Sequence, residues 1–286
     1  MTAPLLWGCM LLAYGPPSAF FLLYVARRSA LLLACLLAAF FWLAALLSAS
    51  LLWWAVPPLR ATPSYPLVTS ALLTEVLRYA LLALYCRADA ALERTGRPLK
   101  PRLLNDLAGA LAMGTGFGLM AAVVSAGPLL ALAGGAAAWY RLPQCPALNA
   151  HVLGAGSALL LSALHAATMP LALDAWRRWA AAVAMAQGSG GGGGGGARAP
   201  GSGAPVMLRL LAPGALHLAF ALLGLLTAEG APRNGCAAVL PLQAVLCLVG
   251  GAAALAAVRR PDYTGRRQVK AWEALAQRLR EEMGAS

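Results

Sequence analysis

Glutamate, arginine and histidine side chains stand in the middle of otherwise apolar stretches, where an ionisable group is costly and usually functional. Glu75 and Arg78 are three residues apart and therefore share one face of a predicted helix. His165 and His217 lie near the centres of two later apolar stretches. At a helix rise of about 1.5 Å per residue, Glu75 and both histidines fall at a similar depth, with Arg78 about one turn away. We therefore predict that the four side chains line one interior polar pocket.

The same residue types serve hydrolytic enzymes. Two histidines and one glutamate are enough to supply the three protein ligands of a catalytic zinc, but the sequence has no HExxH spacing. A Ser-His-Asp constellation, a phosphate-binding loop and paired aspartates at span centres are also absent from it. Buried ion pairs often only offset their own desolvation, and membrane histidines commonly hydrogen-bond between helices. We expect no catalytic residue, no metal and no cofactor, and interpret the pocket as helix packing or a lined cavity.

Seven long apolar stretches must position these side chains. One, at about residues 66–86, is apolar except for Glu75 and Arg78; the six uncharged ones cover about residues 3–25, 31–56, 107–133, 148–174, 210–228 and 237–258. Each is close to the ~20 residues that a helix needs to cross a ~30 Å hydrocarbon core, where backbone groups must be bonded within the segment. The chain is 60% hydrophobic and 11% charged, with a mean hydropathy of +0.71. We predict an all-α integral membrane protein, a bundle of seven transmembrane helices.

The basic residues predict the orientation of the bundle. Of 22 Lys and Arg, 18 follow the odd-numbered spans, whereas only Arg60, Arg141 and Arg233 follow the even-numbered ones, and Arg78 is intramembrane. The positive-inside rule then gives a lumenal or extracellular N-terminus and a cytosolic C-terminus. The net charge of +12 is explained by attraction to anionic lipid at the cytosolic surface, so no nucleic acid is expected as a partner.

The loops between the predicted spans contain no separate soluble domain. We predict a seven-helix transmembrane domain over residues 1–260, interrupted by a flexible Gly-rich cytosolic insert at about 188–203. Residues 261–286 form a basic tail with helical spacing of apolar residues, suited to lying on the membrane surface or to fraying. Asp106 and Asp174 fall at cytosolic membrane edges, where we expect them to be solvated.

Two features of the joints and spans suggest specific contacts. Gly114 and Gly118 form a GxxxG pattern that Ala122 continues, and such small-residue ridges let helix backbones approach closely. Cys145 and Cys236 fall in the lumenal joints after the fourth and sixth spans, a compartment that permits disulfides. The sequence leaves open whether these two cysteines pair.

Several motifs resemble, in order, the first six spans of the anterior-pharynx-defective (Aph) family, the seven-span subunit of γ-secretase. They are GCMLLAYGPPSAFFLLYVA (8–26), AFFWLAALLSASLLWW (39–54), TEVLRYA (74–80), GTGFGLMAA (114–122), LHAATMPLALDAWRRW (164–179) and HLAFALLGLLTA (217–228). The resemblance covers about residues 1–260. It implies that Gly114, Gly118 and Ala122 hold the helix-packing ridge, and that His165 and His217 hold the family's intramembrane histidine positions.

The resemblance also implies a function. Members of the family are non-catalytic scaffolds that bind nicastrin early, receive the C-terminal part of presenilin, and complete γ-secretase with the presenilin enhancer. Proteolysis of type I membrane proteins, among them Notch and the amyloid precursor protein, belongs to presenilin's aspartates. The expected location is the endoplasmic reticulum, Golgi, plasma membrane and endosomes.

This sequence departs from the family pattern in three places. Ala122 stands where the family usually has a third glycine, so we expect looser packing there; the Gly-rich insert is unusual; and Cys145 and Cys236 are not family hallmarks. An alternative function is that of a glutamate-dependent CAAX-type intramembrane protease, which the Glu-x-x-Arg element and two later histidines distantly resemble. That family begins its motif with paired glutamates, but Thr74 precedes Glu75 here, which leaves few groups to activate a water.

Overall fold

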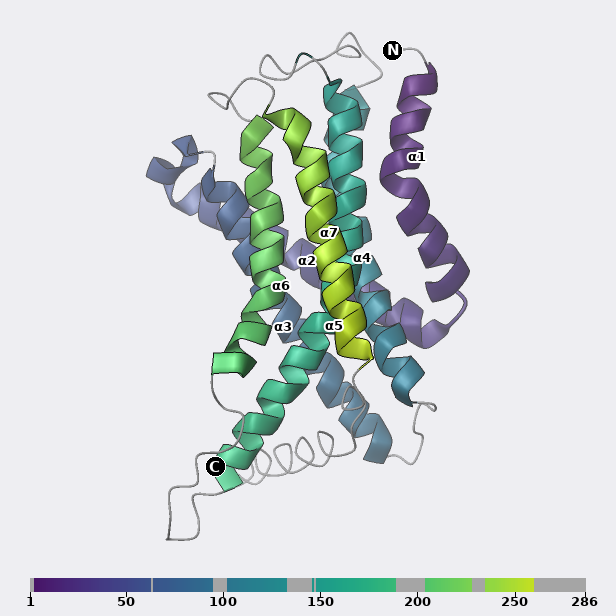
Figure 1. The fold of residues 1–286 in the computed structure, drawn as a ribbon, viewed down its shortest axis with the longest axis vertical. Coiled ribbons are helices and arrows are strands. Elements are labelled where there is room, and N and C mark those ends of the chain that lie inside the picture. The colour runs from purple at the N-terminus through teal and green to yellow at the C-terminus, as the bar shows by residue number, and fades with distance from the viewer. Residues whose placement is uncertain are drawn as a thin grey trace.

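The chain is a bundle of long helices (Figure 1). The computed structural model describes residues 3–62, 64–94, 102–132, 146, 148–188, 204–227 and 235–259. Nearly all of the Gly-rich insert, the tail at 261–286 and Cys145 lie outside the described residues. The main helices are α1 (Ala3–Phe20), α2 (Ser29–Ala55), α3 (Ser64–Arg94), α4 (Arg102–Leu132), α5 (Ala150–Gly188), α6 (Ala204–Leu223) and α7 (Cys236–Val258).

Short tight or wide turns extend three of these helices. Helix α1 contains Pro16 and Pro17 and continues as a π-helical turn, Phe21–Val25. A 3₁₀ turn, Pro57–Ala61, follows α2. A second 3₁₀ turn, η5 (Gly224–Thr227), continues α6. Arg60 donates to the carbonyls of Trp53 and Trp54. Because the last carbonyls of a helix have no partner within it, these bonds cap the end of α2.

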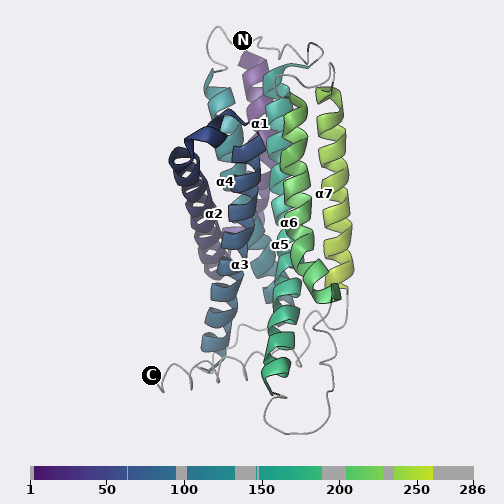
Figure 2. The ribbon, with the colours of Figure 1, turned by 90° about the vertical axis from the view of Figure 1, so that its left-hand side faces the viewer.

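Seven helices in the described part of the chain are long and apolar enough to cross a membrane, which confirms the predicted all-α, seven-span fold. Successive helices run in alternate directions, so that α1 begins at one end of the bundle and α7 ends at the other (Figures 1 and 2). The chain is thus an integral multi-pass membrane protein. The lumenal position of the N-terminus stays a prediction from the basic residues.

The helices extend further than the apolar stretches that predicted them. The fifth stretch was expected to end at about residue 174, but α5 continues to Gly188, and α4 and α6 begin before the predicted residues 107 and 210. Apolar runs mark only the part of a helix that lies in hydrocarbon. The alanines after Arg178 are strong helix formers and carry α5 beyond that part.

The centre of the bundle is α4, which has the largest buried share among the candidate membrane spans of the described residues. Its side chains Met113 and Phe117 are fully buried and pack against Leu81 of α3, Met169 of α5 and Trp42 of α2. Many other spans expose Leu, Val and Phe on their outer sides, as expected where lipid replaces water. The helices that pack most closely on α4 are α5 and α2, whereas α3 packs mainly on α2 and α6. The predicted polar pocket draws most of its residues from α3 and α5.

Candidate functional site

Arg78 is the hub of a buried polar cluster and has no exposed surface. Its guanidinium donates to Thr168 Oγ1 at 2.6 Å and to His165 Nδ1 at 2.8 Å, and it pairs with Glu75 Oε1 at 3.1 Å. The guanidinium carbon also lies 5.3 Å from the centre of the Phe117 ring, within the range of a cation–π contact. One side chain of α3 is thereby tied to both α4 and α5.

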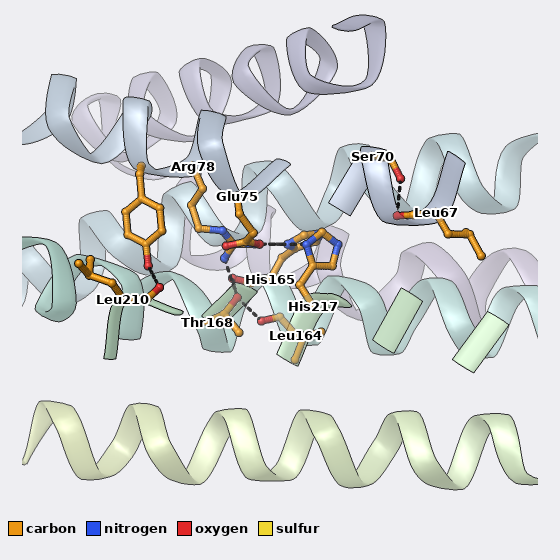
Figure 3. Close-up of polar contacts among 10 residues, drawn as sticks. Leu67, Ser70, Glu75, Arg78, Leu164, His165, Thr168, Leu210 and His217 are labelled. Carbon is orange, nitrogen blue, oxygen red and sulfur yellow. Dashed lines mark hydrogen bonds and ion pairs between the residues drawn. The ribbon is translucent and has the colours of Figure 1, made fainter. Parts of the chain in front are cut away.

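His217 joins the cluster from α6 (Figure 3). Its Nδ1 lies 2.9 Å from Glu75 Oε1, and its ring meets the His165 ring edge-on, with the ring centres 4.8 Å apart. The structure therefore brings together all four side chains predicted from their depth. Thr168 was missed by the sequence reasoning, although its position three residues after His165 puts it on the same helix face.

Local features of α6 let it approach α3 closely. A Cβ added to Gly214 would lie 3.3 Å from the Cγ of Glu75, closer than most such contacts, so a larger residue there would push Glu75 away from His217. One turn away, Tyr79 donates to the carbonyl of Leu210 at 2.5 Å. The Tyr79 bond and Gly214 together hold α6 where His217 can reach the carboxylate.

The cluster is electrically balanced and poorly suited to activate a water. Arg78 and Glu75 carry opposite charges, and the carboxylate already bonds both Arg78 and His217 through Oε1. Among the described residues, no group of three or more His, Cys, Asp and Glu is placed to hold a metal ion. Three of the buried polar atoms, Glu75 Oε2, Arg78 Nε and His165 Nε2, have no hydrogen-bond partner in the described part of the chain.

A cavity of about 510 Å³ adjoins the two histidines, and its walls come from α2 to α7. It reaches from His165 and His217 to Ala150, the first residue of α5, and Thr227, the last residue of η5. Such a volume is typical of ligand pockets. Most of the lining is apolar, with Leu, Ala, Val and Phe side chains between the polar ones.

A second ionic cluster lies nearer the other end of the bundle. Arg177 bonds Asp106 through both terminal nitrogens, at 2.6 and 2.9 Å, with Asp89 3.8 Å away, and Arg178 pairs with Asp174 at 2.9 Å. Asp106 and Asp174 are only 3% and 6% exposed, so the expectation that water solvates them was wrong. Because α5 stays helical past Asp174, it places cations beside both carboxylates.

The predicted small-residue ridge of α4 faces α5. A Cβ added to Gly114 would lie 2.8 Å from the carbonyl oxygen of His165, and one added to Gly118 would lie 2.8 Å from that of Ser162. Ser162 in turn donates its hydroxyl to the carbonyl of Gly118 at 2.7 Å. Ala122, the next small residue, is fully buried beside Ala155.

A family model described as Aph-1 protein matches residues 5–189, more than half of the chain. The chain belongs to the Aph-1 protein family. Members of this family are γ-secretase subunits, which gives the chain its general role. A comparison with curated proteins gives no match. The matched residues include the α4 ridge, Glu75, Arg78 and His165 of this Aph-1 chain, whereas His217 and Cys236 lie beyond them.

The cysteines of this Aph-1 chain are divided between free and bonded forms. Cys9, Cys35, Cys86 and Cys247 are free, and all four lie in the helices, as small hydrophobic residues do. Cys236 at the start of α7 is disulfide-bonded. Cys145, the other cysteine that the sequence puts in a lumenal loop, lies outside the described residues, so the pairing of the two stays a hypothesis.

Proposed function

We propose that the chain is a non-catalytic scaffold subunit of γ-secretase that supports assembly with nicastrin and presenilin, with the presenilin enhancer completing the complex. It thereby supports the proteolysis of type I membrane proteins, while the catalytic aspartates belong to presenilin. Its N-terminus is lumenal and its C-terminus cytosolic. We expect it in the endoplasmic reticulum, Golgi, plasma membrane and endosomes.

The observation that carries this proposal is the set of hydrogen bonds and ion pairs within the polar cluster. Arg78 is fully buried and directs its guanidinium to Glu75, His165 and Thr168 within the chain. These bonds join α3 to α5 and neutralise the carboxylate of Glu75. A guanidinium beside a carboxylate stabilises the charged form and makes it a weaker base for activating the water of a hydrolytic reaction. Together with Aph-1 family membership, this supports a scaffold over the alternative of a CAAX-type protease.

The cavity supports a docking role for the same region. It is lined by residues of α2 to α7, is mostly apolar and extends to the end of the bundle at which α5 begins. A short apolar segment of a partner could enter there and bury its side chains without displacing a helix. We propose that the C-terminal part of presenilin is that segment, and that its insertion couples assembly to the packing around His165 and His217.

Affinity purification of the tagged chain from cells tests the proposal. We expect presenilin, nicastrin and the presenilin enhancer to co-purify, and the complex to cleave a membrane stub of a type I protein. The chain purified alone should cleave neither that stub nor a prenylated peptide. Cleavage of the prenylated peptide by the isolated chain, or an isolation without presenilin and nicastrin, would overturn the proposal.

A further inference from the structure

The contacts around the two histidines determine which ring nitrogen of each carries the proton. An arginine guanidinium has only donors, so His165 Nδ1, 2.8 Å from Arg78, must accept. In a neutral ring the other nitrogen is then the donor, which places the N–H of His165 on Nε2. Glu75 pairs with Arg78, which marks its carboxyl group as ionised and acceptor-only. His217 Nδ1, 2.9 Å from it, therefore donates.

The charge balance keeps His217 neutral. Arg78 and Glu75 already cancel, and a further positive charge inside the membrane would be costly. A neutral His217 that donates from Nδ1 has a lone pair on Nε2. The two rings therefore have opposite tautomers, with a donor on His165 Nε2 and an acceptor on His217 Nε2. Within the described residues, neither of these two atoms has a hydrogen-bond partner.

Several other polar groups that line the cavity already have hydrogen-bond partners within the chain. The hydroxyls of Ser70, Ser125 and Thr227 donate to carbonyls of their own helix turn, and Ser157 donates to Gln243. His165 is 1% exposed, and an unpaired buried donor is destabilising until something accepts from it. In Figure 3 both imidazoles lie on the Ser70 side of the Glu75–Arg78 pair, towards the cavity that Ser70 and both histidines line.

We propose that the histidine end of the cavity is a hydrogen-bonding site for one neutral group that both donates and accepts, a side-chain amide or hydroxyl on an apolar peptide segment. This rests on the proposed function, in which a partner segment enters the cavity. An amide or hydroxyl accepts from His165 Nε2 and donates to His217 Nε2. A carboxylate has no proton to donate to His217 Nε2, and an ammonium has no lone pair with which to accept from His165 Nε2.

A peptide fits the cavity better than a lipid does. The walls come from six helices, so the cavity lies inside the bundle, and it reaches the bundle end at Ala150 and Thr227. A segment of a partner can enter from that end, whereas an acyl chain from the surrounding bilayer would have to pass between packed helices. The site therefore adds specificity to an otherwise apolar pocket, because a buried polar pair is satisfied only by the matching group.

Histidine ¹⁵N spectroscopy on the full-length chain tests the tautomers directly. The chain has only 3 histidines, and single substitutions by asparagine assign them. We expect His165 to show a bare Nδ1 and a protonated Nε2, and His217 the reverse. Identical tautomers, or a doubly protonated His217, would contradict the inference. This test needs no partner protein or peptide.

A set of short capped apolar peptides that differ only at a central Asn, Leu or Asp tests the ligand. Added to the same sample, the Asn peptide should perturb both Nε2 resonances and bind about tenfold more tightly than the Leu peptide, as one satisfied buried pair allows. The Asp peptide should bind no better than the Leu peptide. In H217F the Asn peptide should bind no more tightly than the Leu peptide. If this variant does not fold, the order of the three peptide affinities in the unaltered chain tests the site.

Other outcomes separate the possible explanations. Equal binding of the Asn and Leu peptides, or tight binding of the Asp peptide, overturns the site. If a monoacylglycerol shifts the two resonances and the Asn peptide does not, the site takes a lipid hydroxyl and the peptide proposal is wrong. If the tautomers and the Asn preference hold while presenilin fails to co-purify, the proposed function fails and the site stands. If presenilin co-purifies and the peptides are not distinguished, only the site fails.

Discussion

Replacing Gly118 with alanine tests how closely α4 and α5 pack. The added Cβ would lie 2.8 Å from the carbonyl oxygen and 2.9 Å from the Cα of Ser162. These are backbone atoms and cannot swing aside as a flexible side chain can. Ordinary contacts begin at 3.4 Å, so the two helices must separate by about half an ångström, a shift comparable with the small overpacking displacements seen in cores. The hydroxyl bond from Ser162 to the carbonyl of Gly118 spans the same gap.

The magnitude follows from opposing effects. Alanine in place of glycine inside a helix stabilises by up to about 1 kcal/mol. Overpacking costs about 1–3 kcal/mol, and weakening the Ser162 bond costs about 1 kcal/mol more. We expect Gly118→Ala to lose about 1–3 kcal/mol net, which lowers the midpoint of thermal unfolding by roughly 2–12 °C at ~2–4 °C per kcal/mol.

Gly251→Ala is the matched control, since a Cβ at this helical position meets nothing within 4 Å. The same propensity gain applies there without the clash, so its unfolding midpoint should equal or exceed that of the unaltered chain. Unfolding of the purified protein can be followed with a thiol-reactive dye, because Cys35 and Cys86 are buried and free. The reasoning is refuted if Gly118→Ala melts at or above the unaltered chain, or if both variants shift alike.

Three further predictions concern charge, disulfide and orientation. Arg177→Met should lower the free energy of unfolding by about 3–5 kcal/mol, because Asp106 would stay buried without its cation. Arg27→Met, at an exposed position, should change the unfolding midpoint little. Equal shifts of the midpoint in the two variants would contradict this prediction. Mass mapping without reductant should yield a peptide that joins Cys145 to Cys236, and alkylation of both thiols would exclude it. An antibody should reach an N-terminal tag on intact cells, since the basic residues place that end outside; labelling only after permeabilisation would reverse the topology.

Depth along the helices made the polar cluster predictable from the sequence. Charged groups inside a membrane need partners, and the rise per residue is constant, so residues at one depth are candidates for contact. Glu75, Arg78, His165 and His217 follow this reasoning. The rotation of each helix about its own axis, which decides which side chains face the cluster, cannot be predicted from the rise per residue. Thr168 was missed for this reason, because a neutral hydroxyl can also satisfy itself on its own helix.

The ion pairs of Asp106 and Asp174 could not be predicted from membrane-edge position alone. That position suggested contact with water, but the outcome depended on α5 remaining helical beyond the apolar stretch. The continuing helix brought Arg177 across to Asp106 on α4, 71 residues away in sequence. Arg178 and Asp174 are four apart and could have been paired by helical spacing.

The central claim is that the buried polar cluster serves assembly and not catalysis, and one paired measurement tests it most directly. His165→Ala and His217→Ala are each expressed with the partner subunits, and the amount of assembled γ-secretase and the activity per assembled complex are measured on the same purified samples. Each substitution removes one buried hydrogen bond, that of Arg78 to His165 or that of His217 to Glu75, which is costly. We predict that assembly falls in both variants while activity per assembled complex is largely preserved. Full assembly with abolished activity would contradict the account.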